Sequence, residues 1–491
     1  MSVHKENSII SKNYDFVGIG GGPAGHRGAI QAVKAGAKTA IIDQRPSLGG
    51  VALHSGTVPS KTLREAVLYF GGMRQKHFYG SAYRQKQTII LDDLLLRVDK
   101  VRQKEVQVMD DQLLRNQVDV FCGQTNFEDS HTLVVSTLKD GPVERIRGEK
   151  ILLAVGTVPR RPDNVHFDHE VIFDSTFIVS GKSNAQKLPE SLIVLGAGVI
   201  GIEYACMFAV LGCRVYLVDR RKELFRFLDQ DIYDQLLLAL SKSGVRLILE
   251  DEIGEVRRND RNRGEVELRG GRTIEADAVM FAMGRTPCSY KLRLEMTDVQ
   301  TGKYGNIEVN ENYQTAEAHI YAAGDVIGFP PLAPTSAEQG RLAARHAMGL
   351  EIHSRPELFP FAIYSIPEIS MVGKTEQELI EAEVPYEQGL AFYRDIPKAV
   401  IIGDLDGALK ILLHRETRKI LGVHMIGDLA SELLHIGALA INVDATIDLF
   451  VDTAFNFPTL AEAYKTAALN GINRLEEGCG ESLLTVEAAS S

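Results

Sequence analysis

Two stretches of this sequence repeat one arrangement of three glycines and a carboxylate. The repeated residues are Gly20, Gly22, Gly25 and Asp43 in the first stretch, and Gly196, Gly198, Gly201 and Asp219 in the second. In each stretch the last glycine precedes the aspartate by 18 positions. The first glycine allows a tight turn, the second lets the backbone approach a pyrophosphate, the third lets a helix pack on a strand, and the acid can accept a ribose hydroxyl. We therefore expect two dinucleotide sites; the alternative is two structural units without ligands.

The residues around both stretches predict the strand–helix–strand units that such sites need. Segments 14–19 and 191–195 read as short buried strands, and helical stretches then run to Gly36 and Gly212. Segments 38–43 and 214–219 read as the next strands, each ending on its aspartate. A helix that starts at the glycines presents free N–H groups and the positive end of its dipole to phosphates.

From about Glu357 the pattern changes, and no glycine fingerprint recurs. Segments 361–366, 408–414 and 420–426 read as strands, and 432–443 and 459–475 read as helices, which predicts a third, α+β domain. The tail beyond Glu476 is small and polar, and we expect it to be loosely ordered.

Composition excludes several classes of protein. A chain of 491 residues predicts about two to four domains. The net charge of −11 argues against a general nucleic-acid binder, which needs a basic face. Five cysteines without CxxC spacing, and histidines without clustering, predict neither a disulfide framework nor a metal site. Residues 1–13 lack an apolar signal-peptide core and no apolar run approaches the ~20 residues that span a bilayer, so we expect a cytoplasmic protein without membrane contact.

Several further motifs resemble those of the two-dinucleotide flavoprotein disulfide reductases, which include dihydrolipoamide dehydrogenase and glutathione reductase. In chain order they are Leu48–Gly50, Pro59–Lys61, Ala154–Gly156, Ala282–Arg285, Tyr321–Asp325 and Phe457–Glu462. The resemblance implies an α/β fold with two Rossmann-like, three-layer dinucleotide-binding domains and a C-terminal α+β dimerisation domain. It implies an FAD-binding domain at 1–155 and 281–352, an NAD(P)-binding domain at 156–280, and an interface domain at 353–491. A homodimer or higher homo-oligomer is expected by the same analogy.

Three positions depart from that family and remove its disulfide chemistry. Ala52 and Thr57 stand where the family has its redox cysteines, and Phe457 stands where it has its acid–base histidine. Disulfide exchange needs a thiolate, which neither a methyl group nor a threonine hydroxyl can replace. A phenyl ring cannot manage thiol protons as an imidazole does. The sequence therefore argues against disulfide reduction and leaves the flavin and nicotinamide sites.

The family's motifs without its redox cysteines and histidine resemble the soluble, Si-specific pyridine nucleotide transhydrogenases. The segments that match this group best are Gly56–Arg64, Gly196–Tyr204 and Phe455–Tyr464, although at least one pattern of the group keeps a cysteine at the position of Ala52. The leading hypothesis is FAD-dependent hydride transfer between NADPH and NAD⁺, with one site that takes both nucleotides in turn. The alternatives are an NAD(P)H-dependent diaphorase that reduces a quinone, a metal or oxygen, and a nucleotide-binding protein without turnover.

Lys61 and Glu203 are the residues that the resemblance implies at the reacting centre. In the family this lysine lies beside flavin N5 and pairs with the glutamate that matches Glu203. We expect Lys61 in the first turn of a helix that begins near Pro59, where the helix dipole opposes a cation and a partner should offset that cost. The open alternatives are a lysine that reaches solvent and a glutamate that simply suits the start of its own helix.

The run Asp219-Arg220-Arg221 bears on the choice of nicotinamide nucleotide. An acid at the strand end favours the free 2′-hydroxyl of NAD, whereas arginines just after it can pair with the 2′-phosphate of NADP. The mixture fits an enzyme that accepts both nucleotides. The alternative is two solvated arginines on a site for NAD alone.

The remaining cofactor contacts are also implied by the resemblance. Asp325 matches the acid that contacts the ribityl or phosphate part of FAD, with a plain turn aspartate as the alternative. A helix that starts near Ala333 would point its positive end at the flavin. Glu462 matches the glutamate that orients the missing histidine, so its role stays unassigned. The other residues expected at the cofactors are Gln44, Arg45, Gly49, Gly50, Thr57, Gly156 and Gly284.

Overall fold

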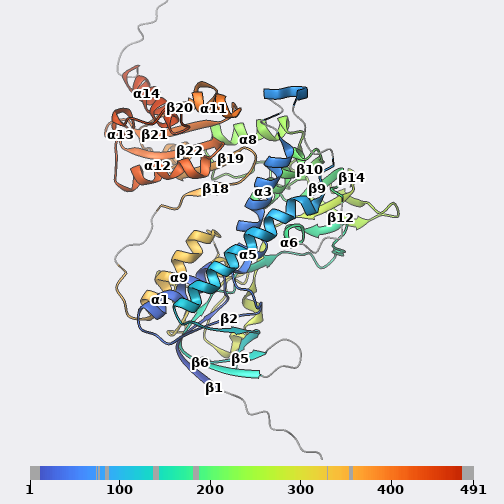
Figure 1. The fold of residues 1–491 in the computed structure, drawn as a ribbon, viewed down its shortest axis with the longest axis vertical. Helices are drawn as coiled ribbons and strands as arrows, with labels where there is room; N and C mark the ends of the chain where they lie inside the picture. Colours follow the sequence, from blue (N-terminus) through green and yellow to red (C-terminus); the bar gives the residue numbers. More distant parts are fainter. Residues whose placement is uncertain are drawn as a thin grey trace, which may run out of the picture.

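Three bodies of secondary structure meet along the long helices α3 (Thr57–Gly71) and α5 (Leu91–Arg115), as Figure 1 shows. The computed structural model describes residues 11–477, apart from 73–74, 76–77, 83–87, 137–142, 181–186, 329 and 353–357. The tail from 478 onward, which was expected to be loosely ordered, lies outside these residues. Among the helices of the described ranges, none is long and apolar enough to cross a membrane.

The first body is a seven-stranded sheet that carries the first glycine fingerprint. Neighbouring strands β3 (Asp119–Cys122), β2 (Thr39–Asp43), β1 (Ser11–Ile19) and β6 (Val143–Leu153) are parallel, and β17 (Ile320–Ala322) pairs with β6 in the same direction. Strands β5 (Thr132–Ser136) and β4 (Gln124–Phe127) extend the sheet antiparallel. Helices α1 (Pro23–Lys34) and α9 (Ala333–Ala347) pack so closely that a Cβ on Gly340 would lie 2.0 Å from the Ala24 carbonyl oxygen.

The second body carries the second fingerprint on a parallel five-stranded sheet. Its order is β11 (Arg246–Ile248), β10 (Arg214–Val218), β9 (Ser191–Leu195), β15 (Ala278–Phe281) and β8 (Ile172–Asp174). All of β9 is buried, as expected of a parallel strand covered on both faces. Helices α6 (Ser175–Val179), α7 (Val199–Val210) and α8 (Gln230–Lys242) contribute to the core on one side, and a sheet of β12 (Ile253–Arg258), β13 (Gly264–Leu268) and β14 (Thr273–Ala276) packs on the other. The paired short strands β7 (Thr157–Pro159) and β16 (Arg285–Pro287) mark the crossings between the bodies.

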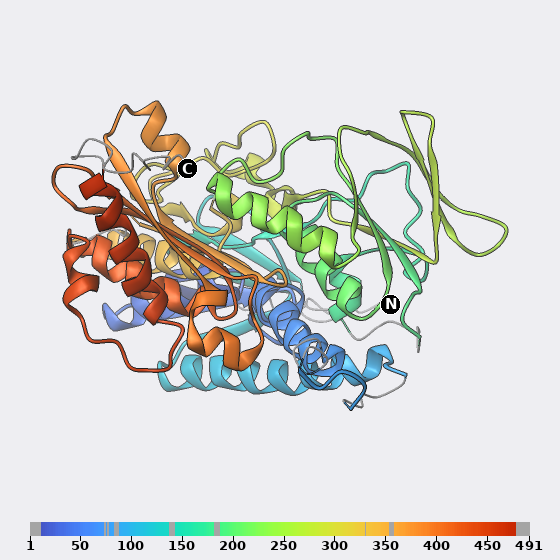
Figure 2. The ribbon, with the colours of Figure 1, turned by 90° about the horizontal axis from the view of Figure 1, so that it is seen from above.

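The third body is an antiparallel sheet with helices, seen at the upper left of Figure 1. Its strand order is β18 (Phe361–Ile363), β19 (Glu368–Gly373), β22 (Ile420–Gly427), β21 (Ala408–His414) and β20 (Tyr386–Phe392). Helices α12 (Ala430–Asn442) and α14 (Glu462–Glu477) pack on it, as Figure 2 shows from above, with short helices α10 (Glu376–Glu381), α11 (Pro397–Ile402) and α13 (Asp448–Asp452). The predicted α/β fold class with a C-terminal α+β part is confirmed.

Some predicted boundaries were wrong. The strand predicted at 361–366 ends at Ile363, because the next residues leave the sheet to contact the other two bodies. The helix predicted from Thr459 begins at Glu462, and the one predicted from Glu432 begins at Ala430. Helix α3 follows the short α2 (Gly50–His54) and begins at Thr57, so Lys61 lies in its second turn rather than its first. The opposing dipole is weaker there, since its effect falls off within the first turn.

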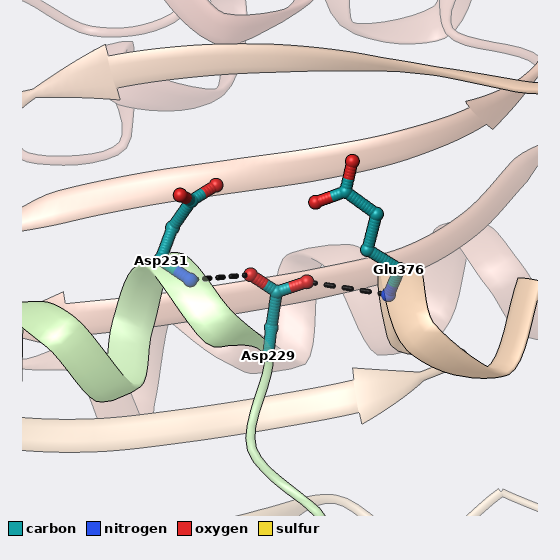
Figure 3. Close-up of side chains that lie close together, drawn as sticks. All are labelled: Asp229, Asp231 and Glu376. Atoms are coloured by element: carbon teal, nitrogen blue, oxygen red, sulfur yellow. Dashed lines mark hydrogen bonds between the residues drawn. The ribbon is translucent and has the colours of Figure 1, made fainter. Parts of the chain in front are cut away.

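Lys410 of β21 ties the second and third bodies together at a buried ion cluster. Its Nζ lies 2.8 Å from Asp229 Oδ1, 2.6 Å from Asp231 Oδ2 and 2.5 Å from Glu376 Oε2. Figure 3 shows these three carboxylates gathered between α8 and α10. Burial lowers the pKa of Lys410, but the carboxylates outweigh burial and hold that pKa above its ordinary value. Although three carboxylates this close could hold a metal ion, the Lys410 ammonium already bridges them.

Replacing Lys410 is expected to loosen this junction. Lys410→Met leaves the fully buried Asp229 carboxylate without its cation, so the free energy of unfolding should fall by about 3–5 kcal/mol. Lys242→Met is the matched control, because it removes only an exposed ion pair with Asp406 and should cost less than about 1 kcal/mol. Denaturant titration of both variants measures the difference. Equal losses would contradict a structural role for the Lys410 cluster.

Candidate active site

A cavity of about 1190 Å³ opens where the three bodies meet. It is lined by both glycine fingerprints and reaches His435 on α12 of the third body. Every residue predicted to contact a cofactor lines this cavity except Gly25, Gly49 and Gly201. The structure therefore brings together side chains that are far apart in the sequence.

The three exceptions support the cavity from behind. A Cβ on Gly25 would lie 1.9 Å from the Gly20 carbonyl oxygen, and a Cβ on Gly201 would lie 1.9 Å from that of Gly196. These last glycines thus let each helix pack on its strand, as the fingerprint predicts. The Gly49 N–H donates to the Gly21 carbonyl at 2.8 Å, which holds the loop before α2 against the fingerprint.

The middle glycines, Gly22 and Gly198, face open space instead. A Cβ on Gly198 would meet no atom within 4 Å, and a Cβ on Gly22 would meet only the Gly50 Cα, at 3.9 Å. Both are N-cap residues, of α1 and α7, and neither helix has a side-chain cap among the described residues. First-turn N–H groups of both helices are therefore available to an anion such as a pyrophosphate.

Asp43 and Asp219 hold equivalent positions in the two bodies. Asp43 accepts the backbone N–H of Gly21 at 2.6 Å, and Asp219 accepts that of Ala197 at 2.8 Å. Each carboxylate thus fixes the turn that follows the first glycine of its fingerprint. Because a carboxylate offers about four lone-pair sites and Asp43 accepts one further bond, from the Arg45 N–H at 2.8 Å, acceptor capacity remains on Asp43 for ribose hydroxyls.

The guanidinium of Arg221 folds back onto Asp219. Its Nε and Nη2 each donate to an Asp219 oxygen at 2.8 Å, and its backbone N–H donates at 2.9 Å. Burial raises the pKa of Asp219, but these bonds outweigh burial and hold the pKa below its ordinary value. The neighbouring Arg220 is exposed and also lines the cavity. The acid and both arginines therefore lie together on the cavity wall, directly after β10.

Lys61 and Glu203 form an ion pair on the cavity wall. Lys61 Nζ lies 2.8 Å from each Glu203 carboxylate oxygen, and the two side chains are 27% and 5% exposed. The backbone N–H of Tyr364 donates to the same carboxylate at 2.9 Å, and the Tyr364 ring lies 4.7 Å from Lys61 Nζ. Each of the three bodies thus contributes one partner, from α3, α7 and the segment after β18.

Asp325 is held by the crossing between the first two bodies. The Thr157 hydroxyl donates to Asp325 at 3.2 Å and accepts a hydrogen bond from Arg285 Nε at 2.7 Å. Arg285 also donates to the Thr157 carbonyl at 2.8 Å, which joins β7 to β16. Burial lowers the pKa of Arg285, and Asp325 acts against that effect. The first residue of α9, Ala333, lines the cavity beside this group.

Profiles of a known protein family match most of this chain. The family profile described as pyridine nucleotide-disulphide oxidoreductase matches residues 14–340, and the family's dimerisation-domain profile matches residues 359–468. The chain belongs to the pyridine nucleotide-disulphide oxidoreductase family. The sequence-based prediction of the family is thereby confirmed.

Curated relatives within the family cover almost the full chain. The soluble pyridine nucleotide transhydrogenase of Mycobacterium bovis is 44% identical over 94% of this chain and 98% of its own. Those of Pseudomonas fluorescens and Azotobacter vinelandii are 42% and 43% identical, each over 94% of this chain and 99% of their own. Among solved structures, LpdA from Mycobacterium tuberculosis has a TM-score of 0.84 at 28% identity, covering 92% of this chain and 99% of LpdA. The HOCl-induced flavoprotein disulfide reductase RclA from Escherichia coli has a TM-score of 0.83 at 25% identity, covering 93% and 99%.

This family member has no thiol pair at the positions where the resemblance places redox cysteines. Ala52 and Thr57 line the cavity there. Cys288 also lines the cavity, but burial raises the pKa of its thiol, which disfavours the reactive thiolate. Phe457 is 67% exposed on the single chain and lies outside the lining. The groups in place around the cavity do not support a thiol relay.

The third body contributes cavity residues that sequence reasoning missed. Tyr364, Ser431 and His435 line the cavity. The strand pattern placed Tyr364 inside a strand, and no motif marks the other two. By contrast, Arg285 is the last residue of the recognised motif Ala282–Arg285, and Thr157 directly follows the motif Ala154–Gly156, so those motifs were a usable signal for them.

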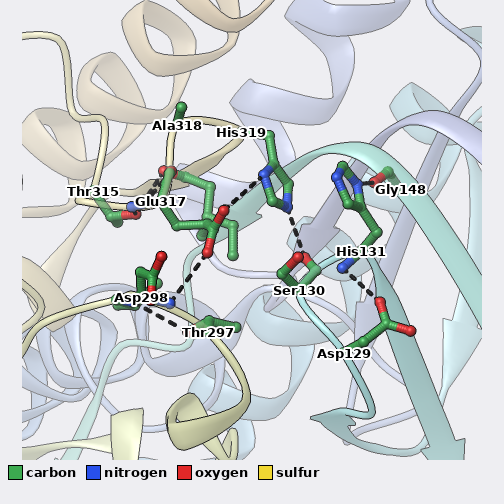
Figure 4. Close-up of polar contacts among 12 residues, drawn as sticks. Asp129, Ser130, His131, Gly148, Thr297, Asp298, Thr315, Glu317, Ala318 and His319 are labelled. Atoms are coloured by element: carbon green, nitrogen blue, oxygen red, sulfur yellow. Dashed lines mark hydrogen bonds and ion pairs between the residues drawn. The ribbon is translucent and has the colours of Figure 1, made fainter.

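Two stacked histidines lie away from the cavity lining. The rings of His131 and His319 are 3.7 Å apart and nearly parallel, at 7°. His131 Nδ1 lies 2.8 Å from the Gly148 carbonyl oxygen, and His319 lies between the Ser130 carbonyl oxygen (2.7 Å) and Glu317 Oε1 (3.4 Å), as Figure 4 shows. The stack ties the β4–β5 turn to the segment before β17 and has no contact with the candidate site.

Substituting the middle glycines should separate folding from ligand binding. Because a Cβ on Gly198 meets no atom, Gly198→Ala should keep its thermal midpoint yet place a methyl group against the pyrophosphate, weakening nicotinamide nucleotide binding by about 10-fold or more. Gly22→Ala is the paired variant and should weaken FAD retention instead. Nucleotide titration and flavin content of the two purified variants check this. Unchanged binding in both would contradict the assignment of the two sites.

Proposed function

We propose that this protein transfers a hydride between NADPH and NAD⁺ by way of FAD. The observation that carries the proposal is one cavity with both fingerprints and the Lys61–Glu203 pair, but with Ala52 and Thr57 in place of redox cysteines. The curated relatives named soluble pyridine nucleotide transhydrogenases support the same activity. The reaction balances without a thiol or an outside oxidant, because the hydride that leaves NADPH is accepted by NAD⁺ and yields NADP⁺ and NADH.

The residues of the first body fit FAD. Gly22 leaves the N-terminus of α1 open to a pyrophosphate, and Asp43 has acceptor capacity for a ribose. Asp325 and the N-terminus of α9 line the same cavity and would suit the ribityl and flavin portions. When bound, FAD supplies a group that can accept a hydride and release it again.

The second body fits a nicotinamide dinucleotide, and we infer that NADPH and NAD⁺ use it in turn. Gly198 leaves the N-terminus of α7 open to the pyrophosphate, as Gly22 does for α1. If Arg221 gives up its side-chain bonds to Asp219, the carboxylate suits the ribose hydroxyls of NAD and the released guanidinium can pair with the 2′-phosphate of NADP. One site that serves donor and acceptor in turn predicts ping-pong kinetics.

Lys61 and Glu203 act through fixed charge. Lys61 places a cation where hydride transfer adds negative charge, and a pre-positioned charge in a water-poor site stabilises that change. Glu203 keeps Lys61 in place with both of its oxygens and is itself held by the Tyr364 N–H. Neither residue is required to transfer a proton.

We further propose that the protein works as a homodimer through its third body. The family's dimerisation-domain profile covers residues 359–468. Exposed apolar side chains in this part could be buried by a second copy; they include Leu429, Leu439, Val443, Leu449, Phe457 and Leu469.

Anaerobic flavin titration tests the proposed activity. NADPH and NADH should each bleach the flavin of the holoprotein, because one site serves both nucleotides. NAD⁺ added after NADPH, or NADP⁺ added after NADH, should restore the absorbance of the oxidised flavin. Stopped-flow absorbance measures each half-reaction. If quinones reoxidise the reduced flavin and neither NAD⁺ nor NADP⁺ does, the protein is a diaphorase. If neither NADPH nor NADH bleaches the flavin, the protein binds nucleotides without turnover.

Arg221 should set the affinity for NADPH. Arg221→Ala removes the partner of the 2′-phosphate but leaves Asp219, so NADPH binding should weaken by about 10-fold while NADH binding changes by less than about 2-fold. Arg226→Ala, at an exposed arginine outside the cavity lining, is the matched control. Equal weakening for both nucleotides would mean that Arg221 does not read the phosphate.

A further inference from the structure

Arg64 lies one turn beyond Lys61 on α3 and is only 4% exposed. Its Nη1 lies 3.0 Å from Glu368 Oε1 on β19, and its Nε donates to the Ser365 carbonyl oxygen at 3.0 Å. The same Nη1 lies 3.2 Å from the exposed carboxylate of Glu65. A buried guanidinium is costly unless its charge and donors are satisfied, so these contacts hold Arg64 in one geometry.

Glu368 carries this contact into the third body. Its Oε2 accepts the Ser431 hydroxyl at 2.9 Å and the Ser431 N–H at 3.3 Å, in the first turn of α12. The Glu368 charge is therefore shared between a cation of α3 and the positive end of a helix that lines the cavity. This buried ion pair joins the first body to the third.

The segment 364–366 runs between these contacts and the candidate site. Arg64 Nε donates to the Ser365 carbonyl oxygen at 3.0 Å. Tyr364, next to Ser365, donates its N–H to Glu203 Oε1. Only four backbone torsions separate the Tyr364 N–H from the Ser365 carbonyl, so anchoring that carbonyl on Arg64 narrows the range of positions from which the N–H can reach Glu203.

We propose that Arg64 and Glu368 are positioning residues for hydride transfer. They orient segment 364–366, whose Tyr364 N–H donates to Glu203. Glu203 in turn fixes Lys61 with both carboxylate oxygens. Neither side chain lines the cavity, so their effect reaches the nucleotides through the residues they hold, in segment 364–366 and at the start of α12. This inference rests on the function proposed above and deepens it. A displacement of about 1 Å in a reacting group can cost as much as 100-fold in rate, so a distant ion pair can matter.

Glu368→Gln is the test variant, because it keeps the shape and one acceptor oxygen, removes the charge, and turns an NH₂ donor toward either Arg64 or Ser431. The rate constant of flavin reduction by NADPH should fall by about 10-fold, while nucleotide affinity changes by less than about 2-fold. The midpoint potential of the bound flavin should shift in the direction that Lys61→Met shifts it. Asp406→Asn is the control, because it removes the charge of an exposed pair that joins the second and third bodies, and it should change neither quantity.

A double-mutant cycle separates positioning from stability. In a Lys61→Met background, Glu368→Gln should slow flavin reduction no further, because the group it positions is gone. Additive losses, or an unshifted flavin potential, would overturn the inference. If Glu368→Gln does not fold, Arg64→Lys replaces it in the same cycle. This variant keeps the positive charge beside Glu368 but lacks the separate Nε donor that reaches the Ser365 carbonyl. Wild-type protein that NADPH does not reduce would refute the proposed function instead, so the two failures can be told apart.

Discussion

A charged carboxylate buried to 5% exposure is the constraint on which the arrangement of this protein depends. Glu203 needs partners for its charge, since an unpaired buried carboxylate would cost several kcal/mol. Those partners are Lys61 from the first body and the Tyr364 N–H from the third. Glu203 lies on α7, and these partners lie on α3 and in the segment after β18. The three bodies must therefore pack so that these elements meet, and they meet at the wall of the cavity.

This convergence decides which chemistry the family fold can support here. Both dinucleotide fingerprints face the same space, so two cofactors bound there would lie in one cavity. The segment that could carry a redox cysteine pair between them has Ala52 and Thr57 instead. The same fold thus loses one chemistry and keeps another without a change of architecture, because function resides in the site rather than in the fold.

Sequence reasoning reached the parts of the site that follow from local physics. The glycine fingerprints predicted the strands, the helices and both acids, because backbone approach and helix packing demand those residues at those positions. It could not reach Arg64, Glu368 or Tyr364, because their roles depend on which residues the tertiary fold brings together. The Lys410 cluster was missed for the same reason: Asp229 and Glu376 look like ordinary helix-start acids until β21 places a lysine between them. The strand after Phe361 was predicted too long because its apolar pattern continues after the chain has left the sheet.

We propose that hydride passes between nicotinamide and flavin with no thiol relay between them. Anaerobic reductive titration of the purified holoprotein with NADPH distinguishes the two cases, because a flavin and a disulfide each take up one electron pair. About one NADPH per bound FAD should bleach the flavin completely and leave no further reducible group. Uptake of a second equivalent per flavin, with thiols appearing as it is consumed, would contradict it.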